Sequence, residues 1–280
     1  STIHESWHGF MNLRSDSYLA RSTDMDYTDI YFWSNMFWLR NYYSGLVHGP
    51  LFDHGVSSCQ PQSHHSCEEE SMRLEGKVAL ISGGARGMGA EEAKLFASEG
   101  AKVVLGDVLE EEGVQIEQEI KQKGGQAKFV KLDVTEESEW EYAVKTAIGL
   151  FGKLDILVNN AGINIRKDAV DLQIEEFKRV LDTNLSGTFL FSQAAGKRFI
   201  KQGSGKVINV SSIMGSVTLP RQTAYSSSKG AVEMLTRVMA LEWATHNVQV
   251  NSLAPTYFET DLTRPLYEDP ERRAFIEERT

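Results

Sequence analysis

Cysteine and long apolar runs are the two features that this sequence most clearly lacks. It has 2 cysteines among 280 residues, too few for a disulfide framework, so nothing in it requires an oxidising compartment. No apolar run approaches the roughly 18 to 20 residues that a membrane-spanning helix needs. The amino terminus also lacks a basic stretch followed by an apolar one, which is the pattern of a secretory signal. We therefore expect a cytoplasmic protein with no membrane partner.

Basic residues are also in the minority. The sequence holds 29 lysines and arginines against 39 aspartates and glutamates, for a formal net charge of -10 and a pI near 5.3. Because a phosphate backbone repels an acidic surface, this balance argues against a nucleic acid as the partner. The rest of the composition, with 41% hydrophobic and 24% charged residues, is typical of a globular protein.

The charge is unevenly spread, with a boundary near residue 72. Residues 1–71 contain both cysteines and all histidines except His246, and their three arginines against nine acidic residues give -6, which leaves -4 for the rest. They show no helical or strand periodicity, and their histidine and cysteine spacing matches no paired-ligand zinc pattern, so we expect no metal site. We interpret 1–71 as a disordered or non-native extension and 72–280 as the functional domain, which opens at Met72.

From residue 77 onward, short apolar runs alternate with helical stretches. This alternation predicts βαβ units with right-handed crossovers, and hence a parallel sheet covered by helices on both faces. We therefore expect a three-layer α/β fold with a doubly wound sheet. The expected strands are 78–82, 102–106, 129–132, 156–159, 206–210 and 248–253. The expected helices are one that ends near 99, three that cover 110–123, 136–150 and 223–245, and two successive segments that together cover 174–201.

A glycine-rich loop joins the first expected strand to the first expected helix. In its sequence S-G-G-A-R-G-M-G, the residues Gly83, Gly87 and Gly89 give the spacing G-x-x-x-G-x-G. Glycines let the backbone turn tightly beside a pyrophosphate, whose charge the first amides of the helix can meet. Asp107 ends the second strand, 107 minus 89 or 18 residues after the last glycine, where an acid binds the adenosine ribose. This acid favours NAD over NADP, although Arg86 could hold a 2′-phosphate.

A tyrosine and a lysine open the long expected helix at 223–245. Tyr225 and Lys229 are four residues apart and so share one face of that helix. An ammonium one turn away favours the phenolate and brings the pKa of the tyrosine toward neutrality, which suits general acid/base catalysis. Ser212, at the end of the fifth strand, can offer a hydroxyl to a substrate oxygen.

These features together resemble the short-chain dehydrogenase/reductase family over about 74–280. The resemblance implies a Rossmann-type sheet and an NAD(P)-dependent oxidoreductase that acts on the CH–OH group of a small molecule. It also implies a homo-oligomer, commonly a homotetramer. The motifs that carry it are the glycine loop, N-N-A-G at 159–162, L-D-T-N at 181–184, V-S-S at 210–212 and Y-S-S-S-K at 225–229.

The resemblance also implies a role for each matching residue. Tyr225 would be the general acid/base and Lys229 would lower its pKa and bind the nicotinamide ribose. Ser212 would orient the substrate oxygen, and Asn184 would support a proton-relay water. Asp133 would contact the adenine. The residues implied to contact the cofactor are Gly83, Arg86, Gly87, Met88, Gly89, Asp107, Asp133, Val134, Asn160, Ala161, Gly162, Tyr225, Lys229, Pro255 and Thr260.

The sequence departs from the family pattern in two places. Where the family has Pro-Gly after the sixth strand, this chain has Pro255 and Thr256, and a β-branched residue resists a positive φ, so we expect an altered backbone there. The family also continues through a further helix and strand. By resemblance the domain is therefore truncated at its carboxyl end and lacks the last helix and strand, which leaves an aggregation-prone sheet edge.

The two halves of the domain resemble enzymes with different substrates. Residues 161–280 are most similar to gluconate 5-dehydrogenase and other sugar-acid or sugar-alcohol enzymes, whereas 83–133 are similar to hydroxysteroid dehydrogenases. We expect a polyol or sugar acid, with Arg166 pairing with a carboxylate and Met214 and Tyr257 lining the pocket. The alternatives are a hydroxysteroid or 3-oxoacyl-type reductase and, in another class, a catalytically silent dinucleotide-binding scaffold.

Overall fold

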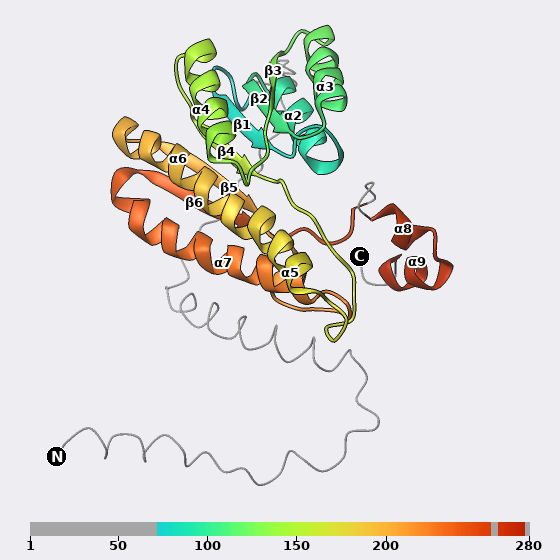
Figure 1. The fold of residues 1–280 in the computed structure, drawn as a ribbon. Coiled ribbons are helices and arrows are strands. Elements are labelled where there is room, and N and C mark those ends of the chain that lie inside the picture. The colour runs from blue at the N-terminus through green and yellow to red at the C-terminus, as the bar shows by residue number, and fades with distance from the viewer. Residues whose placement is uncertain (1–71, 259–262, 278–280) are drawn as a thin grey trace, which may run out of the picture. The chain divides into compact units, whose positions relative to one another are not determined.

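The structure, a computed structural model, describes residues 72–258 and 263–277 (Figure 1). All strand pairs in its single sheet are parallel, and the strand order is β3-β2-β1-β4-β5-β6. The predicted three-layer, doubly wound Rossmann-type α/β fold is confirmed. The strands are β1 (Val78–Ser82), β2 (Lys102–Asp107), β3 (Gln126–Lys131), β4 (Ile156–Asn159), β5 (Gly205–Val210) and β6 (Val248–Leu253).

Helices cover both faces of the sheet. Helices α2 and α3 pack on one face, and α4, α6 and α7 pack on the other (Figure 1). The helices are α2 (Gly87–Ser98), α3 (Glu110–Gln122), α4 (Glu137–Phe151), α5 (Ile174–Leu181), α6 (Gly187–Gln202), α7 (Thr223–Trp243), α8 (Arg264–Tyr267) and α9 (Pro270–Glu277), with single turns at η1 (Asp182–Ser186), η2 (Ile213–Gly215) and η3 (Ala244–His246).

The helices on both faces of the sheet explain why the central strands are unbroken apolar runs in the sequence. Successive side chains of a strand point to opposite faces. In β1, Val78 and Leu80 join the core under α4 and α6, while Ala79 and Ile81 join the core under α2 and α3. All four are fully buried. A strand with only one buried face would have alternated with polar residues instead.

Strand β3 and the link between α5 and α6 differ most from the prediction. Strand β3 begins at Gln126 rather than 129, because it is an edge strand whose Gln126 and Lys128 face solvent while Ala127 is buried. Because these polar residues break the apolar run, the sequence pattern did not indicate that the strand begins at Gln126. The two helical segments expected over 174–201 are α5 and α6, and they are joined by η1, a π-helical turn that was not expected. Such π turns commonly occur at functional sites.

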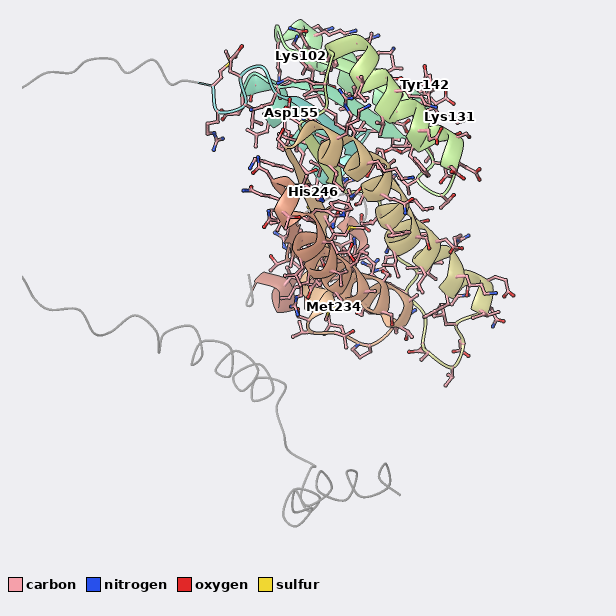
Figure 2. All side chains as sticks on the ribbon, turned by 90° about the vertical axis from the view of Figure 1, so that its left-hand side faces the viewer. Lys102, Lys131, Tyr142, Asp155, Met234 and His246 are labelled. Atoms are coloured by element: carbon pink, nitrogen blue, oxygen red, sulfur yellow. The ribbon has the colours of Figure 1, made fainter. Side chains whose placement is uncertain are left out.

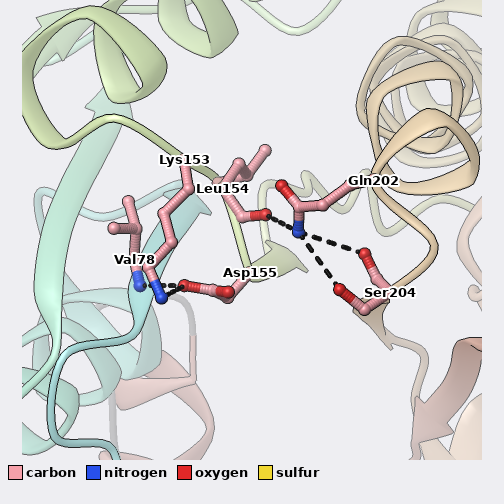
Figure 3. A network of polar contacts seen from close by, with 6 residues as sticks. All are labelled: Val78, Lys153, Leu154, Asp155, Gln202 and Ser204. Atoms are coloured by element: carbon pink, nitrogen blue, oxygen red, sulfur yellow. Dashed lines mark hydrogen bonds and ion pairs between the residues drawn. The ribbon is translucent and has the colours of Figure 1, made fainter.

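A polar network fastens the sheet at the amino ends of its central strands (Figure 3). The Asp155 carboxylate, just before β4, accepts a hydrogen bond from the Val78 amide at 2.8 Å and pairs with the Lys153 ammonium at 3.0 Å. The Gln202 amide, at the end of α6, donates to the carbonyl oxygens of Leu154 and Ser204. This network holds β1, β4 and β5 in register and leaves the carboxyl ends of the strands free to form a site.

The outer surface carries some large apolar side chains. Met234, on the outward face of α7 (Figure 2), is 56% exposed. Among the described residues, no helix is both long and apolar enough to cross a membrane, and no three potential metal ligands gather together. The expectations for 1–71, including the boundary at Met72, and for Thr260 rest on residues outside the described part of the chain.

Candidate active site

A crevice of about 410 Å³ opens at the carboxyl ends of the strands. Residues at or just after the carboxyl ends of all six strands line it. It spans the place between β1 and β4 where the strand order reverses, because the chain runs outward from β1 to β3 and then crosses back to β4. Ligands of open α/β sheets bind at this topological switch point. The expected site residues that line it are Gly83, Arg86, Gly87, Met88, Asp107, Asp133, Val134, Asn160, Ala161, Gly162, Ser212, Tyr225, Lys229 and Pro255.

The glycine loop at one end of the crevice requires its glycines for two different reasons. Gly83 and Gly87 have φ values of 66° and 56°, in the left-handed region that favours glycine. Gly89 does not line the crevice. A Cβ there would lie 2.1 Å from the Gly83 carbonyl oxygen, so Gly89 lets α2 approach the loop. The amides that begin α2 receive no side-chain cap, because the N-cap residue Arg86 makes none.

Asp107 joins the loop to the end of β2. One carboxylate oxygen accepts from the Ala85 amide and the other from the Leu109 amide, both at 3.1 Å. The carboxylate is therefore held in a fixed orientation at the crevice wall. Asn160 makes a similar link on the other side, because its side-chain amide donates to the Gly83 carbonyl oxygen at 3.0 Å.

Tyr225 and Lys229 occupy the opposite end of the crevice, on the first turns of α7. Lys229 is 4% exposed, and its ammonium donates to the Val210 carbonyl oxygen at 2.7 Å. Burial lowers the pKa of Lys229 to about 8. Burial also raises the pKa of Tyr225, and a hydrogen bond with Ser212 and the positive charge of Arg166 oppose that rise.

The expectation that Lys229 lowers the pKa of Tyr225 is therefore wrong, because burial of the phenol dominates and the opposing positive charge comes from Arg166. Arg166 does not line the crevice, but its segment is pinned beside the start of α7. The Arg221 guanidinium donates to the Arg166 carbonyl oxygen at 3.2 Å, and the side-chain amide of Asn164 donates to Gln222 at 2.9 Å. These contacts hold the residues after β4 against the loop that precedes Tyr225.

Ser212 stands at the end of β5, where it caps the turn η2. Its hydroxyl accepts from the Met214 amide at 3.2 Å. Met214 itself is 7% exposed and does not line the crevice, and neither does Tyr257. The wall on this side is formed instead by Thr256, Phe258 and Thr263.

Asn184 lies behind the crevice, in the π turn η1, and is fully buried. Its side-chain oxygen accepts from the Ile163 amide at 2.8 Å, and its amide donates to the Ile163 carbonyl and the Ser228 hydroxyl, both at 3.0 Å. Ser228 in turn donates to the Tyr225 carbonyl at 2.7 Å. Ser228 was not predicted as a site residue, although its place three residues after Tyr225 puts it on the adjacent turn of α7.

Comparison with known proteins finds one family model and several relatives of the same enzyme class. The family model described as short chain dehydrogenase matches residues 77–271. A 3-alpha-(or 20-beta)-hydroxysteroid dehydrogenase of Mycobacterium bovis is 44% identical over 199 residues, which are 71% of this chain and 75% of that protein. A cyclopentanol dehydrogenase of Comamonas testosteroni is 42% identical over 199 residues, covering 71% and 80%.

A solved structure also matches over most of its length. The gluconate 5-dehydrogenase of Burkholderia cenocepacia, crystallised with NADP and tartrate, is 36% identical with a TM-score of 0.71. The match covers 75% of this chain and 82% of that one. The similar proteins are therefore named for different substrates: a hydroxysteroid, a cyclic alcohol and a sugar acid.

Proposed function

This chain belongs to the short-chain dehydrogenase family, and we propose that it interconverts a secondary alcohol and a ketone with a nicotinamide dinucleotide, NAD(H) in preference to NADP(H). The observation that carries the proposal is one crevice with a glycine cradle at one end and Ser212, Tyr225 and Lys229 at the other. Positioned groups at both ends suit a reaction between a bound cofactor and a small molecule.

The residues at the cradle end fit a dinucleotide. The uncapped amides of α2 suit a pyrophosphate, and a side chain at Gly83 would come within 2.9 Å of the Ala161 backbone. Asp107, with its carboxylate held by two amides, suits the two hydroxyls of an adenosine ribose. Arg86 lines the same wall, and a related enzyme was crystallised with NADP, so the preference for NAD rests on Asp107.

At the other end, the residues of this chain handle the proton. A bound nicotinamide supplies the hydride acceptor or donor. In the direction of alcohol oxidation, Tyr225 as phenolate takes the hydroxyl proton, and the Ser212 hydroxyl hydrogen-bonds to the same substrate oxygen. Arg166 and Ser212 favour the phenolate that burial disfavours. Lys229 is placed to bind the ribose hydroxyls, and Asn184 holds the backbone at Ile163 that closes the crevice from behind.

For the substrate, we propose a polyol or sugar acid. Arg166 does not line the crevice, but its positive charge acts on Tyr225, so it would attract a substrate carboxylate close to the reacting carbon. The second candidate is a hydroxysteroid or another cyclic alcohol. The 44% and 42% identical relatives support it, and so do Ile163 and Phe258, which give the crevice an apolar wall.

The test follows NADH absorbance with gluconate, cyclopentanol and a 3-hydroxysteroid, each offered with NAD and with NADP. We expect turnover with gluconate and NAD. The matched control is Tyr225→Phe, which should still bind NADH, because only the hydroxyl is lost, but should lose about 10²- to 10⁴-fold in kcat. Full turnover by Tyr225→Phe would contradict the proposed mechanism. NADH binding with no turnover of any alcohol or ketone would favour the silent scaffold.

Two further expectations become part of this proposal. The active domain is residues 72–280, so a chain that begins at Met72 should keep its activity, and loss of activity would contradict this assignment. The enzyme is also a homo-oligomer, because Met234, Val238 and Leu241 expose one apolar face of α7 at 56%, 46% and 80%. Met234→Glu with Leu241→Glu should shift the mass measured by light scattering toward the monomer.

A further inference from the structure

Glu233, on α7 one turn beyond Lys229, contacts both ends of the turn that carries Ser212. The Ser216 hydroxyl donates to its carboxylate, at 3.2 Å from Oε2 and 3.4 Å from Oε1. The Ser211 hydroxyl shares its proton between Glu233 Oε1 at 3.2 Å and the Lys229 carbonyl oxygen at 3.0 Å. Since Ser211 and Ser216 flank the turn η2, a single carboxylate spans it from end to end.

The turn also rests directly on the backbone of α7. A Cβ at Gly215 would lie 3.0 Å from the Lys229 carbonyl oxygen and 2.7 Å from Glu233 Oε1, and a Cβ at Gly230 would lie 3.1 Å from the Gly215 carbonyl oxygen. No side chain separates the turn from the helix. On the side that faces α7, this glycine contact and the Glu233 carboxylate set the position of the turn, while the Ser211 and Ile213 amides tie it to the Leu253 and Pro255 carbonyl oxygens on the other side.

We propose that Glu233 is a positioning residue that holds the Ser212 hydroxyl against Tyr225. This inference rests on the proposed function. Glu233 does not line the crevice, so it acts through the turn rather than on the substrate. Ser212 lies between Ser211, which Glu233 holds, and Met214, whose amide donates to the Ser212 hydroxyl. Removal of the carboxylate would free the Ser216 hydroxyl and leave the Ser211 hydroxyl with the Lys229 carbonyl oxygen as its only acceptor.

A loss of position at Ser212 has a signature that a general loss of stability would not produce. The hydrogen bond with Ser212 lowers the pKa of Tyr225, while burial raises it. The other charged groups facing Tyr225 are Arg166, from the loop after β4, and Lys229, from α7, and neither lies on the turn that Glu233 holds. Displacement of Ser212 alone should therefore raise the pKa of Tyr225 and move the pH–rate profile for alcohol oxidation to higher pH.

The experiment compares Glu233→Ala and Glu233→Gln with Glu242→Ala, an exposed glutamate of the same helix. We expect Glu233→Ala to lower kcat roughly ten- to hundredfold, as small misplacements of reacting groups do, and to shift the profile to higher pH. Its affinity for NADH should stay within about twofold, because the glycine cradle is untouched. Glu233→Gln keeps an acceptor oxygen and should recover most of the activity, and Glu242→Ala should match the wild type.

The decisive comparison is whether the effects of Glu233→Ala and Ser212→Ala on kcat add up in the double variant. In a Ser212→Ala background, Glu233→Ala should have little further effect on kcat, because the group it positions is gone. An equal loss in both backgrounds would show that Glu233 acts elsewhere and would overturn the inference, as would wild-type kcat and pH profile in Glu233→Ala. If Glu233→Ala does not fold, Ser216→Ala, which removes one arm of the contact, should give the same shift in smaller measure.

A second readout keeps this inference separate from the proposed function. Ultraviolet phenolate absorbance, with Tyr225→Phe subtracted as background, titrates Tyr225 without any turnover. An upward shift of the pKa in Glu233→Ala would support the positioning role even if no alcohol or ketone is turned over, and an unchanged pKa would contradict it. Absence of turnover in the wild type would instead count against the proposed function alone.

Discussion

Replacement of Lys229 by methionine should stabilise the folded protein at neutral pH while removing its activity. Lys229 is 4% exposed, and burial lowers the pKa of its ammonium from 10.5 to about 8. The folded state therefore binds this proton less tightly than the unfolded state does. Methionine has a similar length and carries no charge that needs hydration, so the substitution removes the cost of desolvating an ammonium.

The magnitude follows from proton linkage. At about 1.4 kcal/mol per pKa unit, the shift makes the charged lysine cost about 3 kcal/mol of unfolding free energy below pH 8. Because the unfolded state binds more protons between pH 8 and 10.5, the wild-type stability rises through that interval and the cost disappears above it. Methionine leaves the Val210 carbonyl oxygen without its hydrogen bond, which costs about 1 to 3 kcal/mol. The net gain at pH 7 is therefore about 0 to 2 kcal/mol.

The assay is urea unfolding of both proteins at pH 7 and pH 9.5. The stability difference between Lys229→Met and wild type should fall by about 2 kcal/mol between these two pH values, with equal m-values. Other titrating groups cancel in the difference, because both proteins carry them. A difference that is the same at both pH values would refute the reasoning, since it would mean that the Lys229 ammonium is as well solvated in the fold as in the unfolded chain.

Three other substitutions test separate parts of the crevice. Gly89→Ala places a Cβ 2.1 Å from the Gly83 carbonyl oxygen, so it should cost about 1 to 3 kcal/mol in urea unfolding and weaken NADH binding measured by fluorescence titration; unchanged binding would contradict the assigned fit. Asp107→Asn removes the charge and one acceptor, so it should lower the ratio of kcat/KM for NAD over NADP by roughly tenfold or more, and an unaltered ratio would refute its role. Arg166→Leu should raise KM for gluconate roughly tenfold and leave KM for cyclopentanol nearly unchanged; equal effects on both would exclude a carboxylate anchor.

Much of the fold was predictable because it depends on local patterns. The apolar runs at 78–82 and 156–159 are buried on both faces in a parallel sheet, so they stand out from the helical stretches around them. The start of β3 was mispredicted because an edge strand can hold polar residues such as Gln126 and Lys128 on its exposed side. The π turn η1 was not predicted, because a five-residue turn is too short to show a hydrophobic periodicity that differs from that of an α-helix.

The candidate site divides in the same way. The glycine loop, Asp107, Tyr225 and Lys229 were recognisable because each sits at a strand end or on one helix face, at a short and fixed spacing in the chain. Met214, by contrast, was expected to contact substrate and is buried beneath its own turn. Neither Ser228 nor Glu233 was predicted as a site residue, because a serine or a glutamate within a helix is common. Their hydrogen bonds to Asn184 and to Ser211 join elements far apart in the chain.

The sequence by itself determined the alternating fold, the glycine loop and the tyrosine–lysine pair, because residues close in the chain specify all three. Tertiary structure alone decided the electrostatics at Tyr225. The parallel strands bring Arg166, Ser212 and Tyr225 to one edge of the sheet from three different segments. It also decided that Lys229 is buried enough for its pKa to fall to about 8. Burial and charge proximity depend on packing in space, and spacing along a chain does not report them.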